Sequence, residues 1–368
     1  MQFELAGSAD EPALRRLLHA APLAGDIRVT LEREPCIEFA NAIEGERTQI
    51  LVARAPREPA VVAMGARTLR MSFVNGRPTR IGYLGLLRVL PQYQGQAVLL
   101  KRGYAALHAL HADGAATLYL TTIVADNHPA RRLLEAGVRG FPTYRPVGDL
   151  VTLVLPTRHR RRRPARGGVS VTSATASDIG EIARCLTRYG ERFQFAPCWT
   201  PAELVSAVRA RGLAPGDFLL AHRASRVVGC AACWDQREFK QVVVHGYSPR
   251  LRRARVLWNL LATCSGAPRL PPVGATLAFA YLSHLAVDED DAQVFEALIG
   301  ACLRSAARRG LEHLAFGLGE RNPLAATALA RFRSRPFRSR AYLVHWSDGE
   351  AAARAVDSRP MHLEAAIL

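Results

Sequence analysis

The strongest pattern of apolar and polar positions lies early in the chain. Residues 81–90 are mostly apolar and rich in branched side chains, which predicts a buried strand. Pro91 ends this run because proline has no N–H for a strand ladder. A polar loop at 92–96 and an alanine- and leucine-rich helical pattern at 98–112 follow. A strand, tight loop and helix in this order aim backbone N–H groups and the positive end of the helix dipole at one point, which favours a phosphate.

Weaker patterns predict further elements on both sides of this unit. Before it, the sequence predicts one helix and two alternating strands, at 13–20, 49–55 and 60–69. The pair Asn75-Gly76 predicts a tight turn between strands. After the unit, the sequence predicts a strand, a short helix and a last strand, at 116–124, 130–136 and 144–155. This alternation predicts an α/β fold with a mixed sheet.

The same order of patterns begins again after residue 168. The repeated strands and helices are expected at 169–174, 179–186, 218–221, 226–234, 281–287, 292–309 and 311–318. Asn127 and Asn322 are 195 residues apart (322 − 127), and Val89 and Val287 are 198 apart (287 − 89). Two nearly equal offsets indicate an internal duplication, so the sequence predicts two α/β domains in tandem.

Residues 89–97, VLPQYQGQA, resemble the acetyl-CoA signature of the GNAT superfamily of N-acetyltransferases. In that signature an apolar strand precedes Arg/Gln-x-x-Gly-x-Gly/Ala at the start of a helix, and Gln94 falls on the first position. Ala97 stands where the first glycine is expected, and Leu99 stands where the second small residue is expected. Asn127 begins a segment that resembles the second family motif. The resemblance implies two tandem GNAT folds.

The resemblance also implies acetyl-CoA as co-substrate. Main-chain groups at the end of the signature strand would hold the pantetheine arm, the loop amides would hold the pyrophosphate, and Asn127 would contact the arm. The cofactor-binding residues expected on this basis are Leu87, Arg88, Val89, Gln94, Gly95, Gln96, Ala97, Val98, Leu99 and Asn127.

Tyr83 is the candidate catalytic residue. Some members of the superfamily carry a glutamate six residues before the position of Val89, and Tyr83 stands there. Alternation along the strand predicts that Tyr83, Gly85, Leu87 and Val89 share one face. An ordinary tyrosine pKa near 10 makes a poor base, so Tyr83 acts through water or lines the pocket. The tyrosine that commonly serves as general acid in the family is replaced by Leu134.

Other polar residues are weaker candidates. Glutamates at 32–46 fall in the region that covers the acceptor site in this family, where they would favour a cationic amine; alternatively they form a solvated helical face. His108 and His111 are expected to be surface or packing residues. Tyr119 and Tyr144 are expected in the core or a pocket wall.

The loop of the second repeat differs in charge. Residues 288–291 are four carboxylates where a pyrophosphate would lie, and each like-charge contact at about 4 Å costs on the order of 1–4 kcal/mol. Acidic residues also suit a helix N-terminus. We therefore expect a GNAT domain at 1–156, a basic linker at 157–168, a degenerate GNAT-like domain without cofactor at 169–348, and a peripheral tail at 349–368.

Composition limits the partners and the compartment. The net charge of +17 permits anionic partners, among them CoA, whereas direct nucleic-acid binding through the linker arginines is the less favoured interpretation. No apolar run reaches the roughly 18 residues of a membrane span, and the N-terminus does not resemble a signal peptide.

The seven cysteines are scattered, and no cluster of Cys and His predicts a metal. Alternation predicts that Cys230 and Cys233 point to opposite faces of a strand as buried free thiols, which is typical of a reducing cytoplasm.

These observations favour a cytoplasmic acyltransferase that moves an acetyl group from acetyl-CoA to a primary amine of a small molecule or peptide. The alternative is a catalytically inactive GNAT-fold protein that binds CoA or an effector and acts as a regulator or scaffold. The sequence carries no sign of an oligomeric state.

Overall fold

The computed structural model describes residues 1–368 except 24, 56–59, 158–167, 266–268, 333 and 335. The elements of the first half, in chain order, are β1 (Gln2–Leu5), α1 (Glu11–His19), β2 (Ile27–Glu32), α2 (Ile37–Glu44), β3 (Arg47–Arg54), β4 (Val61–Val74), β5 (Arg77–Val89), α3 (Ala97–His111), β6 (Tyr119–Val124), α4 (His128–Glu135) and β7 (Thr143–Pro156).

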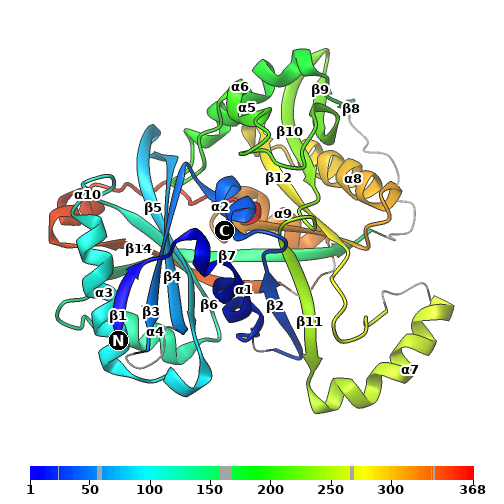
Figure 1. Ribbon diagram of the computed structural model, residues 1–368. Helices are drawn as coiled ribbons and strands as arrows, with labels where there is room; N and C mark the ends of the chain where they lie inside the picture. The colour runs from blue at the N-terminus through cyan, green and yellow to red at the C-terminus, as the bar shows by residue number, and fades with distance from the viewer. Residues whose placement is uncertain (24, 56–59, 158–167, 266–268, 333, 335) are drawn as a thin grey trace.

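The second half begins at Val169 and repeats the core of this order (Figure 1). Its elements are β8 (Val169–Ser173), α5 (Ile179–Gly190), α6 (Pro201–Leu204), β9 (Phe218–Arg223), β10 (Arg226–Trp234), β11 (Gln241–Tyr247), α7 (Pro249–Ser265), β12 (Phe279–Val287), α8 (Ala292–Arg308), β13 (His313–Gly319), α9 (Pro323–Arg331), β14 (Phe337–His345) and α10 (Glu350–Arg354).

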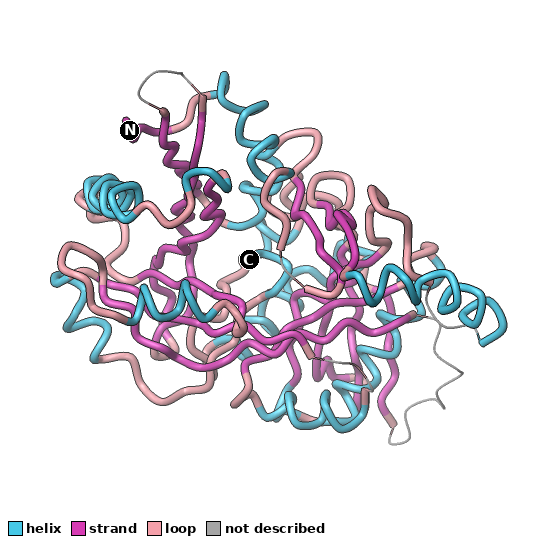
Figure 2. Tube along the Cα trace, turned by 90° about the horizontal axis from the view of Figure 1, so that it is seen from below, coloured by secondary structure: helices cyan, strands magenta, loops and turns pink. Residues whose placement is uncertain are grey.

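Twelve strands of the described chain form one mixed sheet. The order is β1-β3-β4-β5-β6-β14-β7-β13-β12-β10-β9-β8, and in Figure 2 the strands run across the molecule from one side to the other. Parallel pairing occurs between β5 and β6 and between β12 and β13, and the other pairs are antiparallel. The predicted α/β fold with a mixed sheet is confirmed.

The two halves exchange their last strands. β7 lies between β14 and β13, and β14 lies between β6 and β7, so each half is completed by a strand of the other. Leu155 pairs with Leu314, and Val344 pairs with Tyr119. The sequence segments expected as separate domains therefore share one sheet. Residues 158–167 of the expected linker lie outside the described residues.

The turn signal before the signature strand is confirmed. Val74 pairs with Arg77, and the two residues between them, Asn75 and Gly76, have φ values of 53° and 75°. Asparagine and glycine tolerate this left-handed backbone better than other residues, which explains why they close the hairpin.

Helices cover both faces of the sheet. In the first half, α3 packs on β1 and β3, and α1 and α2 pack near β4 on the other face. In the second half, α8 and α5 cover opposite faces of β10 and β12. Cys230 and Cys233 are fully buried, free, and packed in the two clusters on opposite faces, as predicted.

The expectation of a peripheral C-terminal tail is wrong. Met361, Leu363 and Ile367 are almost fully buried, and the last residue lies in the middle of the molecule between the two halves (Figure 1). The main chain of this segment is held by side chains from both halves, because Arg70 donates to the carbonyl oxygen of Ile367 and Gln236 donates to that of Ala366. These apolar residues at the end of the chain therefore belong to the core and not to the surface.

The sequence analysis did not predict the extension formed by β2, β11 and α7. β2 and β11 pair with each other as a separate two-stranded sheet, and α7 follows β11 at the edge of the molecule (Figure 1). Besides the exchange of β7 and β14, this pairing is another connection between the two halves.

Candidate functional site

The first half has an opening between β5 and β6. The two parallel strands pair only at Gly82 with Tyr119 and at Tyr83 with Leu120, although both strands continue beyond these positions. A Cβ atom at Gly82 would lie 2.1 Å from the ring of Tyr119, so the strands approach closely before they separate.

A bulge interrupts β5 at the start of the opening. Gly85 and Arg88 pair with β4 residues that are only two positions apart, so β5 carries one extra residue, and Leu86 has a left-handed φ of 54°. Because of the extra residue, Arg88 lies on the face of Tyr83, and Val89 lies on the opposite face. The predicted single face for Tyr83, Gly85, Leu87 and Val89 is therefore wrong beyond Gly85.

The bulge also exposes side chains at the opening. Leu87 is one of the more exposed large apolar residues of the first half, and Val89 is partly exposed. The side chain of Arg88 donates to the carbonyl oxygen of Leu87, while its Nε is buried without a partner in the described chain.

The loop between β5 and α3 presents unpaired backbone donors. The amides of Gly95, Gln96, Ala97 and Val98 have no hydrogen-bond acceptor within the described residues, and α3 has no side-chain cap. All four residues are exposed. A run of free N–H groups at the start of a 15-residue helix is a favourable place for an anion.

Two residues shape this loop. Gly95 has φ 77°, a conformation that glycine adopts without strain. The side-chain amide of Gln94 donates to the carbonyl oxygen of Val89 at 3.1 Å, which ties the loop to the end of β5.

Leu99 does not intrude on the loop. Its side chain is 6% exposed and packs against Val62 and Ala63, and its amide donates to the carbonyl oxygen of Gln96. Ala97 and Val98 point outward, Val98 being 66% exposed. Ala97 and Leu99, which differ from the family signature, therefore do not cover the free amides.

Asn127 lies at the N-terminus of α4, at the far side of the same opening. Its side-chain oxygen accepts from the amide of Ala130 at 3.3 Å, and its NH₂ group has no partner within the described residues. The residue is exposed. Its donor therefore remains available to a ligand.

The equivalent loop in the second half is neutralised from within. Asp288 contacts Arg188 and Arg226, Asp290 contacts Arg192, and Asp291 contacts Arg223. The carboxylate of Asp291 also accepts from the amides of Gln293 and Val294, which are the donors that an anion would need. The arginines therefore offset the negative charge that was expected to repel a pyrophosphate, and Asp291 itself occupies the amides at the start of α8.

The rest of the second opening is filled by protein. The segment 361–368 packs against β12 and β13: the amide of His284 donates to Glu364, and a Cβ at Gly317 would lie 3.2 Å from Ala365. Asn322 is 2% exposed, and its NH₂ group donates to the hydroxyl of Tyr189 at 3.0 Å. The features that are open in the first half are closed in the second.

Tyr83 lies where β5 and β6 separate. Its hydroxyl is 2.8 Å from the Thr122 hydroxyl, and the guanidinium of Arg70 lies 5.0 Å from its ring centroid. Burial raises the pKa of Tyr83 above its ordinary value. Tyr83 therefore keeps its proton at neutral pH, which suits a proton donor better than a base.

The glutamates near the acceptor region mostly pair with basic residues. Glu34 pairs with Arg15, Glu46 with Arg80 and Glu32 with His19, and Glu38 is exposed. They therefore offer little free negative charge to a cationic amine.

Glu44 is the buried member of this set and belongs to a cluster that spans both halves. It accepts from Arg33 at 2.6 Å and from Lys240 at 3.1 Å. Burial opposes its ionisation, but Arg33 and Lys240 together hold the pKa of Glu44 below its ordinary value. With Arg70 and Arg88 nearby on the sheet, cations predominate on this face. No local signal could have placed Lys240 here, because it lies on the second half.

His111, Tyr119 and Tyr144 are packing residues, whereas His108 is exposed. His111 is buried between Tyr119 and Asp348, with ring stacking on Trp346 at 4.6 Å. Tyr144 shares a 2.6 Å hydrogen bond with Tyr104. These contacts agree with the predicted core and wall positions.

Neither a membrane span nor a metal cluster was found in the residues that the structure describes. No helix there combines the length and apolar character needed to cross a membrane, and no three His, Cys, Asp or Glu side chains gather as metal ligands.

Comparisons with known proteins assign the fold through structure. No family model and no curated protein matches the sequence. The chain resembles a GCN5-related N-acetyltransferase from Sphaerobacter thermophilus, with a TM-score of 0.56 and 14% identity over 93% of this chain and 94% of that one. It also resembles N-myristoyltransferase of Saccharomyces cerevisiae with bound myristoyl-CoA, with a TM-score of 0.57 and 12% identity over 93% and 82% of the two chains.

A third similar structure is the GCN5-related glucosamine N-acetyltransferase region of a fungal multi-domain GH3 β-N-acetylglucosaminidase. The TM-score is 0.62 with 12% identity, and the match covers 93% of this chain and 38% of that one. The chain therefore spans well under half of this larger protein. The protein has the GNAT fold, which these acyltransferases share.

Proposed function

We propose that the protein is an N-acyltransferase that moves an acetyl group from acetyl-CoA to a primary amine of a small molecule or peptide. The acetyl donor is expected to bind in the first half only. Acetyl-CoA would supply the activated thioester, and the protein would hold it and manage protons.

The contrast between the two halves carries this proposal. In the first half, four consecutive amides at the start of α3 are free within the described residues, Asn127 is exposed, and β5 and β6 pair at only two positions, Gly82 with Tyr119 and Tyr83 with Leu120. In the second half, Asp291 occupies the corresponding amides and the segment 361–368 packs against the strands. A protein that kept one set of anion donors free and closed the other is expected to bind one cofactor.

The residues would divide the work as follows. The amides from Gly95 to Val98 would bind the pyrophosphate, with the helix dipole adding attraction for negative charge. The exposed end of β5 at Leu87 would contact the pantetheine arm. Tyr83, which stays protonated at neutral pH, would donate its proton to the leaving thiolate.

The alternative is a CoA-binding regulator without catalysis. The pairing of the acceptor-side glutamates with basic residues favours it, because these carboxylates are then poor bases for an amine. Both functions require binding of acetyl-CoA or CoA, so the affinity for the cofactor does not distinguish them. Transfer of the acetyl group to an amine does.

The first test is calorimetric titration of the purified protein with acetyl-CoA. Val98→Asp places a carboxylate beside the free amides on an exposed position and should weaken binding at least tenfold. Val98→Asn is the neutral control, and Gln293→Asp adds the same charge at the equivalent exposed position of the second half. Neither control should change the affinity.

The outcome assigns the function. One site per chain, followed by thiol release in the presence of a primary amine, supports the transferase. Binding without thiol release across an amine panel supports the regulator, and no binding of acetyl-CoA refutes both.

A further inference from the structure

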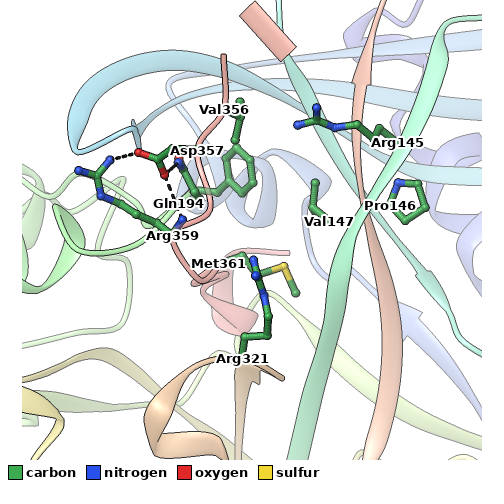
Figure 3. A pocket seen from close by; sticks show the side chains of 10 residues that line it. Arg145, Pro146, Val147, Gln194, Arg321, Val356, Asp357, Arg359 and Met361 are labelled. Atoms are coloured by element: carbon green, nitrogen blue, oxygen red, sulfur yellow. Dashed lines mark hydrogen bonds and ion pairs between the residues drawn. The ribbon is translucent and has the colours of Figure 1, made fainter. Parts of the chain in front are cut away.

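A cavity of about 200 Å³ lies where four segments from both halves meet (Figure 3). Arg145 comes from the exchanged strand β7, Gln194 follows α5, Arg321 lies in the loop between β13 and α9, and Asp357 and Arg359 follow α10. The cavity is separate from the opening between β5 and β6.

The lining carries more positive than negative charge. Three arginines face one carboxylate, and that carboxylate is already engaged: Asp357 accepts from Gln194 at 2.6 Å and pairs with Arg359. The side chains of Arg145 and Arg321 have no ion pair or hydrogen bond within the described residues. Figure 3 shows Arg145 extending from strand β7 and Arg321 extending from the loop between β13 and α9.

Nearby carboxylates offset only part of this charge, and neither pairs with Arg145 or Arg321. Asp149 on β7 pairs with Arg340, whereas Glu320 accepts from the amide of Asp149 at 3.2 Å, a contact that leaves its charge uncompensated. Two guanidinium groups therefore remain available at one small cavity. Guanidinium groups present several N–H donors in a planar fork, a geometry that fits phosphate and carboxylate oxygens in pairs.

We propose that this cavity binds a small dianion of the phosphate-monoester class, held by Arg145 and Arg321. The cavity volume suits a phosphate group with a few attached atoms and is below the range usual for larger cofactors. This inference does not depend on the proposed acetyl transfer.

The position of the cavity gives such a ligand a structural effect. Phe195 and Met361 form part of its wall and belong to the same apolar cluster as Tyr83. A ligand that bridges β7, the β13–α9 loop and the segment before Met361 would hold the C-terminal segment against the sheet and stabilise the wall behind Tyr83.

The probe for the test is inorganic phosphate at constant ionic strength, with chloride as the balancing anion. Calorimetry and thermal unfolding would be measured for the full chain, for Arg145→Gln/Arg321→Gln and for each single variant. Arg304→Gln removes an exposed arginine on α8 as a matched control. Val98→Asp reports binding of phosphate at the start of α3.

We expect phosphate to bind saturably to the parent protein and to Arg304→Gln, with a Tm increase on the order of 2 °C at tenfold excess over Kd. The double variant should bind at least tenfold more weakly, and each single variant should be intermediate. Unchanged affinity in the double variant, or no saturable binding to the parent protein, would overturn the proposal. Loss of binding in Val98→Asp alone would assign the phosphate to α3 and overturn it as well.

Discussion

Leu86 on β5 and His284 on β12 occupy the same position in the two halves, with left-handed φ values of 54° and 51°. They are 198 residues apart (284 − 86), the spacing that also separates Val89 from Val287. Left-handed backbone is uncommon outside glycine, so its recurrence at one offset supports the internal duplication. The surroundings of the two residues differ. Leu86 is partly exposed beside the opening, whereas His284 is buried and packs 4.4 Å from the ring of Trp199.

Replacement of Tyr83 should separate chemistry from binding. In Tyr83→Phe, kcat should fall about 100-fold because the proton donor is lost, while the KM for acetyl-CoA should change little. Steady-state thiol release would measure both parameters. Tyr104→Phe removes a tyrosine hydroxyl that, within the described residues, bonds only Tyr144, and it should leave kcat unchanged. An unaltered kcat in Tyr83→Phe would show that the tyrosine only lines the site.

The two equivalent asparagines should have opposite effects. Serine keeps a helix cap but lacks the NH₂ donor. Asn127→Ser should lower the affinity for acetyl-CoA several-fold with little change in stability, because its NH₂ group makes no contact in the described chain. Asn322→Ser should cost about 1–3 kcal/mol of unfolding free energy, because it leaves the buried Tyr189 hydroxyl without its partner, and should not change the affinity. Calorimetry and urea unfolding test the pair, and equal behaviour of the two variants contradicts the assigned asymmetry.

Local pattern was enough to predict the repeated elements and the signature loop. Gln94 and Gly95 lie in the loop between β5 and α3, and Asn127 lies at the start of α4, as the pattern predicted, whereas the arginines that pair with the acidic second loop were not predicted. Alternation failed at Leu86, because a bulge adds one residue to the strand without changing which residue types are apolar.

Features that depend on contacts between distant segments could not be predicted, because local sequence pattern does not show which segments meet in the fold. Leu153 and Leu155 on β7 would be buried beside any neighbouring strand, so their apolar character does not reveal the exchange with β14. Met361 and Leu363 were predicted to lie in a peripheral tail. Their burial depends on strands that are distant in sequence, so the local pattern could not reveal it. Arg145 and Arg321 are 176 residues apart (321 − 145) and meet at one cavity only through the fold.

The ion pair between Arg67 and Asp113 should contribute more to stability than an exposed pair. Arg67 on β4 is 1% exposed and donates to both carboxylate oxygens of Asp113 and to the carbonyl oxygen of Leu110. Asp113→Ala leaves this buried charge under-compensated and should cost roughly 3 kcal/mol. Glu46→Ala removes the partner of the exposed Arg80 and should cost less than about 1 kcal/mol. Equal costs in urea unfolding would refute the structural role of the buried pair.

Glu364 should make the stability of the protein depend on pH in a defined direction. Burial raises its pKa to about 7 from an ordinary value of 4.5, even though the amide of His284 donates to its carboxylate. The folded protein therefore binds a proton between pH 4.5 and 7 that the unfolded chain has released. The contribution of Glu364 to stability is complete below pH 4.5 and is lost as the pH rises to 7, by roughly 3 kcal/mol.

Glu364→Gln isolates this contribution because glutamine keeps an acceptor for the His284 amide and does not ionise. Relative to the parent protein, the variant should gain about 3 kcal/mol of unfolding free energy between pH 4.5 and pH 8. His284 and His362 are buried with lowered pKa values and titrate with the opposite sign, since stability is lost as the pH falls below 6.5, but they do so in both proteins and cancel in the difference. Chemical unfolding at several pH values measures the difference directly. A difference that does not vary with pH would mean that Glu364 ionises as readily in the folded protein as in water.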